Sequence, residues 1–181
     1  IFFLQKCNRR VSGDILKKGG YKEGKKTGVW ETFYENGAKE HEGIFSSDKE
    51  EGKWTSWYEC AGCIPGENGQ IKDIGNFAGG FMDGKWNGWY EDGKKRVEPE
   101  YKTGVKHGHW KKWYPDETLD FECDYSDGFL DGKWTAWHPC RGCKAGENGN
   151  LKEEGQYKKG KQDGLWKLFY GDGKPYMIQN Y

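Results

Sequence analysis

Two pairs of cysteines are the residues whose types and spacing could most directly support chemistry. Each pair has the arrangement Cys-x-Gly-Cys, in the segments 59–66 (Cys60 and Cys63) and 139–146 (Cys140 and Cys143). Such a pair can close a local disulfide, supply two thiolates to a metal ion, or remain as redox-active thiols. A closed zinc site needs four ligands, so a metal ion at these loops would require a second pair or a partner chain. The sequence leaves the three possibilities open.

Other residues with chemical potential fit a structural role. His107 and His109 could bind a metal weakly from one strand face, but solvated strand residues are the simpler interpretation. Three aspartates that recur before Gly-x-Trp are expected in turns, not as an acid–base pair: Asp83, Asp131 and Asp163. No nucleophile elbow, zinc-protease, phosphate-loop or dinucleotide motif is present. We therefore predict that the protein is not an enzyme, has no catalytic residues, and has no cofactor beyond a possible metal ion at the cysteine loops.

Composition narrows the kinds of partner. The 181 residues carry 29 positive and 29 negative side chains, so no net field attracts nucleic acid. No apolar run approaches the roughly 18 residues that a transmembrane helix needs. The six cysteines favour an extracellular or periplasmic location. Because the first residue is not methionine, we expect either a processed chain or a fragment.

One repeated pattern must position all of these residues. Gly-x-Trp-x-x-aromatic occurs six times, with the tryptophans Trp30, Trp54, Trp86, Trp110, Trp134 and Trp166. Successive tryptophans are 24, 32, 24, 24 and 32 residues apart, so the cysteine segments are the eight-residue extensions of two longer units. Self-similarity at a fixed period is typical of repeat architectures.

The residue pattern of each unit predicts a β-hairpin. Asn-Gly and Asp-Gly pairs supply the positive φ of tight turns, at Gly37, Gly69, Gly93, Gly149 and Gly173. A second glycine, as at Gly43 and Gly155, is expected to leave room for a ring on the neighbouring strand. Cys123 replaces this glycine in one unit, and we expect it to be unpaired. The predicted fold class is all-β: an elongated single-layer antiparallel meander of β-hairpin repeats, a solenoid sheet of about twelve strands.

These units resemble a known family. The pattern Tyr-x-x-Gly-x-x-x-Gly-x-Trp, seen from Tyr21 to Gly37 and from Tyr157 to Gly173, is similar to the MORN repeat, and most to the variant in bacterial antitoxin-like proteins. The resemblance implies a scaffold for protein–protein contact or membrane association, without catalytic residues.

The predicted organisation has an N-terminal cap or degenerate repeat at 1–20 and an array of about six repeats at 21–181, with the cysteine insertions at 59–66 and 139–146. A column of aromatic residues, expected to face away from the repeated tryptophans, is the predicted partner-binding surface: Phe33, Trp57, Trp89, Trp113, Trp137 and Phe169. Either the protein's own Lys and Glu stems cover this column or a partner does. The predicted function is a scaffold that binds a protein or further copies of itself. The alternatives are a metal-binding or redox module at the cysteine loops and association with lipid headgroups through lysine-rich turns.

Overall fold

Antiparallel strands make up the regular structure of a computed structural model that describes residues 17–60, 68–140, 142–143 and 147–181. This part of the chain contains no helix, so the predicted all-β fold class, an antiparallel meander of β-hairpin repeats, is confirmed. Internal contacts divide the chain into two units, 1–93 (unit 1) and 94–181 (unit 2), and each is described by itself.

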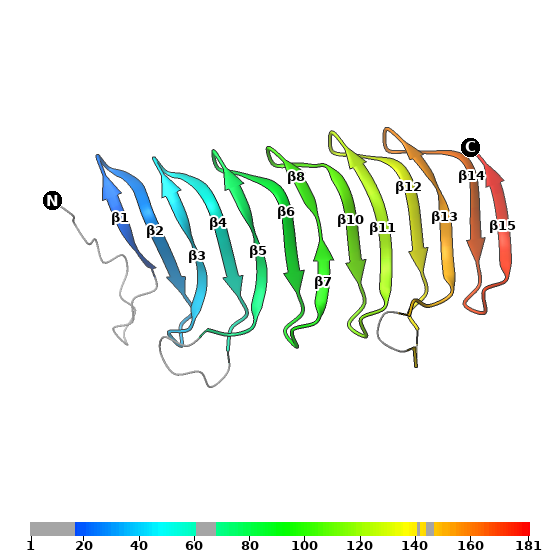
Figure 1. Ribbon diagram of the computed structural model, residues 1–181, viewed down its shortest axis with the longest axis horizontal. Helices are drawn as coiled ribbons and strands as arrows, with labels where there is room; N and C mark the ends of the chain where they lie inside the picture. The colour runs from blue at the N-terminus through cyan, green and yellow to red at the C-terminus, as the bar shows by residue number, and fades with distance from the viewer. Residues whose placement is uncertain (1–16, 61–67, 141, 144–146) are drawn as a thin grey trace. The chain divides into compact units, whose positions relative to one another are not determined.

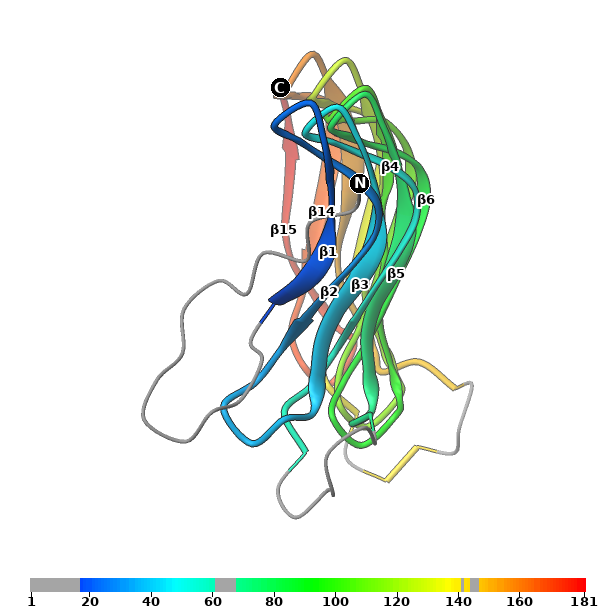
Figure 2. The same ribbon diagram turned by 90° about the vertical axis from the view of Figure 1, so that its left-hand side faces the viewer.

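Unit 1 is a meander in which every strand pairs with the next one along the chain (Figure 1). Its strands are β1 (Lys17–Lys22), β2 (Lys25–Phe33), β3 (Lys39–Ser46), β4 (Lys49–Trp57), β5 (Ile71–Ala78) and β6 (Phe81–Trp89). The strands are twisted and bowed along their length (Figure 2), as the chirality of the backbone requires. Residues 17–20, placed in the predicted cap, lie in β1, and the rest of that cap falls outside the described residues.

Unit 2 continues the same pattern with one interruption. Its strands are β7 (Lys95–Glu98), β8 (Glu100–Lys102), β9 (Val105–Lys106), β10 (Gly108–Trp113), β11 (Leu119–Ser126), β12 (Phe129–Trp137), β13 (Leu151–Lys158), β14 (Lys161–Phe169) and β15 (Pro175–Asn180). The strand order is β7-β10-β11-β12-β13-β14-β15, and β8 pairs with β9. Pro99 separates β7 from β8, because proline has no N–H to donate to a strand ladder.

Two-residue turns close one end of the hairpins. Both turn residues have positive φ, for example 52° at Glu23 and 78° at Gly24, which suits the twist of the flanking strands. Asp48 takes the place of the glycine in one hairpin with φ 69°, and its Oδ1 accepts a hydrogen bond from the Lys26 N–H at 2.7 Å. The carboxylate thus links this turn to the preceding hairpin.

Turns at the opposite end follow the predicted Asn-Gly and Asp-Gly pattern in three units. Gly37, Gly93 and Gly173 have φ of 83°, 86° and 85°. The prediction was wrong for Gly69 and Gly149 in the cysteine loops, where φ is not positive. These two are glycine because a Cβ would overlap the carbonyl oxygen of Tyr58 or His138.

The core of each unit is a ladder of rings. In unit 1, Tyr21, Trp30, Phe45, Trp54, Phe77 and Trp86 make successive edge-to-face contacts, with centroids 5.2–5.8 Å apart. Four of the six repeated indoles lie over a strand glycine, and a Cβ on that glycine would come closer than 3.0 Å to the ring. These pairs are Gly19 with Trp30, Gly43 with Trp54, Gly75 with Trp86 and Gly155 with Trp166. The expectation that the strand glycines make room for rings is confirmed.

Cys123 changes this packing at one tryptophan. Its thiol is free and only 1% exposed, as expected for an unpaired cysteine in the glycine position. Burial raises the pKa of this thiol to about 12. The Trp134 indole stacks on Phe121, with centroids 5.1 Å apart and ring planes at 18°, and its Nε1 donates to the Glu153 carboxylate at 2.8 Å. Where cysteine replaces the strand glycine, the neighbouring indole therefore takes a different position.

Candidate interaction surface

The predicted aromatic column occupies equivalent positions, because each member is the last residue of a strand: β2, β4, β6, β10, β12 or β14. Trp57 is buried at 9% exposure, and the other five side chains are half-buried. The Lys39 ammonium lies 5.6 Å from the centroid of the Trp57 ring. The stem of a charged residue thus covers part of the column, which was one of the two predicted arrangements.

Lys39 is held in place by carboxylates on two strands. Its Nζ lies 2.7 Å from Glu31 on β2 and also pairs with Glu42 on β3. The hydrogen bond from Lys39 lowers the pKa of the Glu31 carboxyl, although burial alone would raise it. This charged cluster therefore stabilises the cover over Trp57.

The backbone of the column ties each repeat to the one before it. Tyrosine hydroxyls donate to column carbonyls from Tyr34 to Trp57 at 2.7 Å, from Tyr58 to Trp89 at 2.9 Å and from Tyr114 to Trp137 at 3.1 Å. His138 replaces tyrosine in the next unit, and its Nε2 lies 3.0 Å from the Phe169 carbonyl. Because a carbonyl only accepts, the Nε2 of His138 must carry the proton. The histidine is a packing substitute for tyrosine.

The most exposed large apolar side chains lie elsewhere. They include Val29 at 58%, Phe81 at 54%, Phe129 at 59%, Leu165 at 54% and Ile178 at 62%. The sequence indicates some of these exposed residues, but the prediction based on the aromatic column did not include them. Phe81, Val105 and Phe129 stand five residues before a repeated tryptophan, where the other units have Lys25, Lys49 and Lys161.

Strand β15 also exposes large apolar side chains. All six of its residues are exposed, and Tyr176, Met177 and Ile178 are 48%, 44% and 62% exposed. At the same repeat positions, β13 has three charged residues, Lys152, Glu153 and Glu154. Exposed apolar residues that replace charged ones mark a candidate interaction surface.

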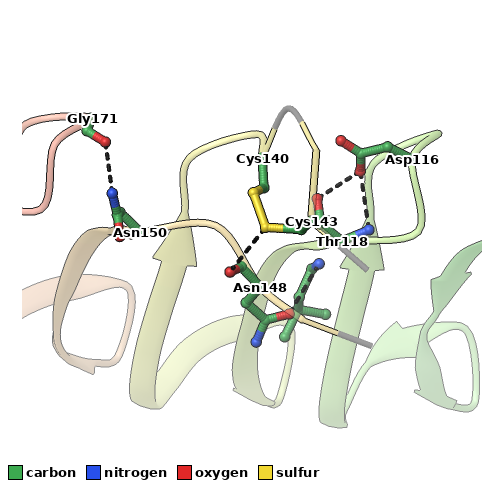
Figure 3. The surroundings of a disulfide bond; sticks show 8 residues. Asp116, Thr118, Cys140, Cys143, Asn148, Asn150 and Gly171 are labelled. Atoms are coloured by element: carbon green, nitrogen blue, oxygen red, sulfur yellow. Dashed lines mark hydrogen bonds between the residues drawn. A yellow bond between two sulfur atoms is a disulfide. The ribbon is translucent and has the colours of Figure 1, made fainter. Parts of the chain in front are cut away.

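The second cysteine loop is closed by a disulfide between Cys140 and Cys143, with Cα atoms 5.7 Å apart (Figure 3). The Cys143 Sγ lies 3.7 Å from the Asn148 carbonyl, and the Asn148 side-chain oxygen accepts from the Leu119 N–H at 3.3 Å. Asn150 donates to the Gly171 carbonyl at 2.8 Å. The loop is therefore anchored to the turns on both sides of it.

The first cysteine loop is described only in part. Cys60 is disulfide-bonded, and its carbonyl accepts a hydrogen bond from the Asn36 side chain at 2.9 Å. Cys63, its predicted partner, lies outside the described residues, as do Cys7 and most of the segment 59–66. A sulfur in a disulfide is not a thiolate, so metal binding by Cys140 and Cys143 would require their reduction.

Among the described residues, no group of three or more His, Cys, Asp or Glu side chains is arranged to hold a metal ion. His107 and His109 have different surroundings, because Gly108 between them has φ 66° and interrupts the alternation of the strand. The His109 Nδ1 lies 2.8 Å from Asp124 on β11. The His107 Nδ1 is buried and has no hydrogen-bond partner in the described part of the chain. The two imidazoles therefore do not form a common site.

Comparison with known families agrees with the repeat architecture. The family described as MORN repeat variant matches residues 26–46, 106–127, 146–159 and 162–181. These four segments are similar to that repeat, and they include parts of both units. No curated protein matches the chain. In the described residues, no helix is long and apolar enough to cross a membrane.

Proposed function

We propose that this protein is a non-catalytic repeat scaffold that binds protein, including further copies of itself. The observation that carries the proposal is the exposure of the apolar side chains of Tyr176, Met177 and Ile178 on β15. MORN repeats are generally associated with protein or membrane-lipid interaction, which is consistent with such a surface. The closer likeness to the antitoxin-like variant stays a prediction from the sequence and contributes no catalytic residue.

The surface of β15 favours a protein partner for a physical reason. Tyr170 and Tyr176 form a ring pair with centroids 4.6 Å apart beside Met177 and Ile178, and all four side chains are exposed. Aromatic residues and methionine are enriched in the buried centres of protein interfaces, where charged residues are depleted. The predicted column of six aromatics, from Phe33 to Phe169, is proposed as a secondary contact surface, because most of its members are half-buried.

Size-exclusion chromatography with light scattering tests the proposal. We expect the chain to form species larger than a monomer as its concentration rises. The double substitution Met177→Glu with Ile178→Glu, which installs the charges of β13, should restore the monomer. Val29→Lys is the matched control, because it replaces an equally exposed apolar residue in unit 1 with the lysine found at Lys53 and Lys133. A wild-type chain that stays monomeric at all concentrations would contradict self-association.

A lipid surface is the second candidate, favoured by apolar side chains on two neighbouring turns of unit 2. Phe129 and Val105 are 59% and 44% exposed. Lys102 and Lys106 flank Val105 in the sequence, and Lys159 and Lys161 flank Gly160, which lies beside Phe129. Apolar tips beside lysines suit an anionic membrane surface. Flotation with phosphatidylserine vesicles that is lost in Phe129→Lys would support it. Flotation that does not depend on anionic lipid would count against it.

A further inference from the structure

A cavity of about 270 Å³ lies between the side chains of Trp30 and Trp54 in unit 1. The Phe45 ring stands between the two indoles, edge-to-face to both, with centroids 5.8 and 5.2 Å away. The middle of the cavity is therefore lined by three aromatic rings. Such walls bind flat apolar surfaces.

Polar side chains line one end of this cavity. Thr32 and His41 are cross-strand partners on β2 and β3, two residues beyond Trp30 in the strand direction. The Thr32 hydroxyl lies 3.1 Å from the His41 Nδ1. Lys17 on β1 is the register partner of Thr32 and also lines the cavity. This end offers a hydroxyl, an imidazole and an ammonium group.

The opposite end carries one charge of each sign. The Lys26 ammonium lies 5.0 Å from the centroid of the Trp30 ring and 4.7 Å from that of Phe45. Glu50 on β4 is the cross-strand partner of Phe45 and lines the same cavity. Hydrogen-bond donors and acceptors are thus present at both ends of an aromatic trough.

The Trp54 indole differs from its counterparts in its hydrogen bonding. Its Nε1 is buried and has no hydrogen-bond partner among the described residues. In four other units the indole N–H donates to a carbonyl ten residues earlier, at 3.0–3.2 Å, from Trp30, Trp86, Trp110 and Trp166. A buried donor without an acceptor is destabilising. Because this Nε1 is itself buried, it does not face an incoming ligand, but its resonance is sensitive to changes around the Trp54 ring that lines the cavity.

The adjoining gap of unit 1, between Trp54 and Trp86, has Ser56 and Asp73 in the positions of Thr32 and His41. The gap between Trp110 and Trp134 in unit 2 is built differently. Lys112 stands in the position of Thr32, and Phe121 stands in the position of His41. Phe121 stacks on Trp134, with centroids 5.1 Å apart. In this gap of unit 2 an aromatic contact therefore lies where the cavity of unit 1 has its hydroxyl and imidazole, so the polar lining differs from gap to gap.

We propose that this cavity binds a neutral monosaccharide. A pyranose has apolar C–H faces, one of which can lie against an aromatic ring of the cavity, and its rim of hydroxyls can both donate and accept. That rim matches the lysine, threonine, histidine and glutamate groups at the two ends. The volume suits a ligand smaller than a drug-sized molecule, for which pockets start at about 300 Å³. This inference is independent of the proposed protein-binding role and involves a different surface.

The indole N–H of Trp54 provides a direct readout of binding. In a ¹H–¹⁵N spectrum of the full chain, Trp54→Phe identifies its resonance by loss, and Trp30→Phe identifies that of Trp30. Titration with methyl β-D-glucopyranoside should shift both resonances saturably. Glycerol, which has hydroxyls without a ring, and cyclohexanol, which has a ring with one hydroxyl, should not. Absence of a saturable shift, or an equal response to glycerol, would overturn the proposal.

Two variants test the placement of the sugar. Thr32→Val and Glu50→Ala remove polar groups from opposite ends of the cavity, and each should weaken binding about tenfold, as expected for one lost hydrogen bond. Lys112→Val, at the equivalent position in unit 2, is the matched control and should bind like the wild type. The dispersion of the remaining indole resonances reports whether each variant is folded. Unchanged affinity in both folded cavity variants would refute this site.

Discussion

Gly155 shows at the scale of a single residue why strands in this chain contain glycine. The Trp166 indole lies where a Cβ on Gly155 would be, and Trp166 is only 1% exposed. We predict that Gly155→Ala lowers the free energy of unfolding by about 1–3 kcal/mol, because the ring must move within a packed ladder. Urea denaturation measures the change. Gly171→Ala is the control, since a Cβ there has no neighbour within 4 Å; equal losses in both variants would contradict this explanation.

Cys123 makes a second residue-scale prediction, which concerns pH. Burial raises the pKa of this thiol from 9.0 in its ordinary state to about 12. The folded chain therefore keeps the proton more tightly than the unfolded chain. Its contribution to stability is complete below about pH 9 and is lost as the pH rises toward 12, at up to about 1.4 kcal/mol per pH unit.

The measurement compares the wild type with Cys123→Ala by urea denaturation at pH 8 and at pH 10.5. Burial also raises the pKa of Tyr114 to about 12, which gives a slope of the same sign in both proteins. The decline between the two pH values should be steeper in the wild type, and this difference isolates the thiol. Parallel declines would show that Cys123 is not buried in the folded chain.

Residue types predicted much of the packing but not its exceptions. The glycine beneath four of the indoles followed from the repeat, because a small residue that recurs beside a large one indicates contact. The new position of Trp134 did not follow, since several rotamers are open to an indole once Cys123 occupies the space. The pairing with Phe121 and Glu153 depends on side chains from two neighbouring strands, which a one-dimensional pattern does not relate.

At the scale of elements, the Cys140–Cys143 loop supports a prediction about the disulfide. Replacing both cysteines with serine should cost at most about 2 kcal/mol, since so short a loop restricts the unfolded chain little. Hydrogen exchange should accelerate in residues 138–150, while β12 and β13 keep their protection. This outcome is expected because those strands are held by their own ladder, which keeps one register from Gly132 to Ala136. Equal acceleration in the two strands would mean that the bond stabilises the sheet itself.

Strands and turns could be predicted from the sequence where the turn residues and the spacing of the repeated residues agree. The hairpins, their order and their two-residue turns follow from glycine spacing, and the chain builds them as expected. The interruption at Pro99 was readable in principle, because a proline in a strand position removes a donor. The φ of Gly69 and Gly149 was not readable, since the same Asn-Gly pair occurs where a carbonyl approaches closely and where φ is positive. The exposed surface of β15 was readable only by comparing its residues with those of β13.

At the scale of the whole molecule, a repeat array is stabilised mainly between neighbours. Every strand within a unit pairs with adjacent strands, and the ring ladders, the tyrosine-to-carbonyl hydrogen bonds and the turn contacts all join neighbouring hairpins. The stability of such an array is approximately a sum of repeat terms and nearest-neighbour terms. A local defect should therefore loosen its own neighbourhood first.

Gly43→Ala and Gly155→Ala test this locality as a reciprocal pair, because each places a Cβ beneath an equivalent indole in a different unit. We predict that hydrogen exchange accelerates mainly in β3, β4 and β5 for the first variant, and mainly in β13 and β14 for the second. Each variant serves as the control for the other, since the chemical change is the same. If both variants accelerate exchange throughout the chain, unfolding is a single cooperative event, and the nearest-neighbour description of this protein is wrong.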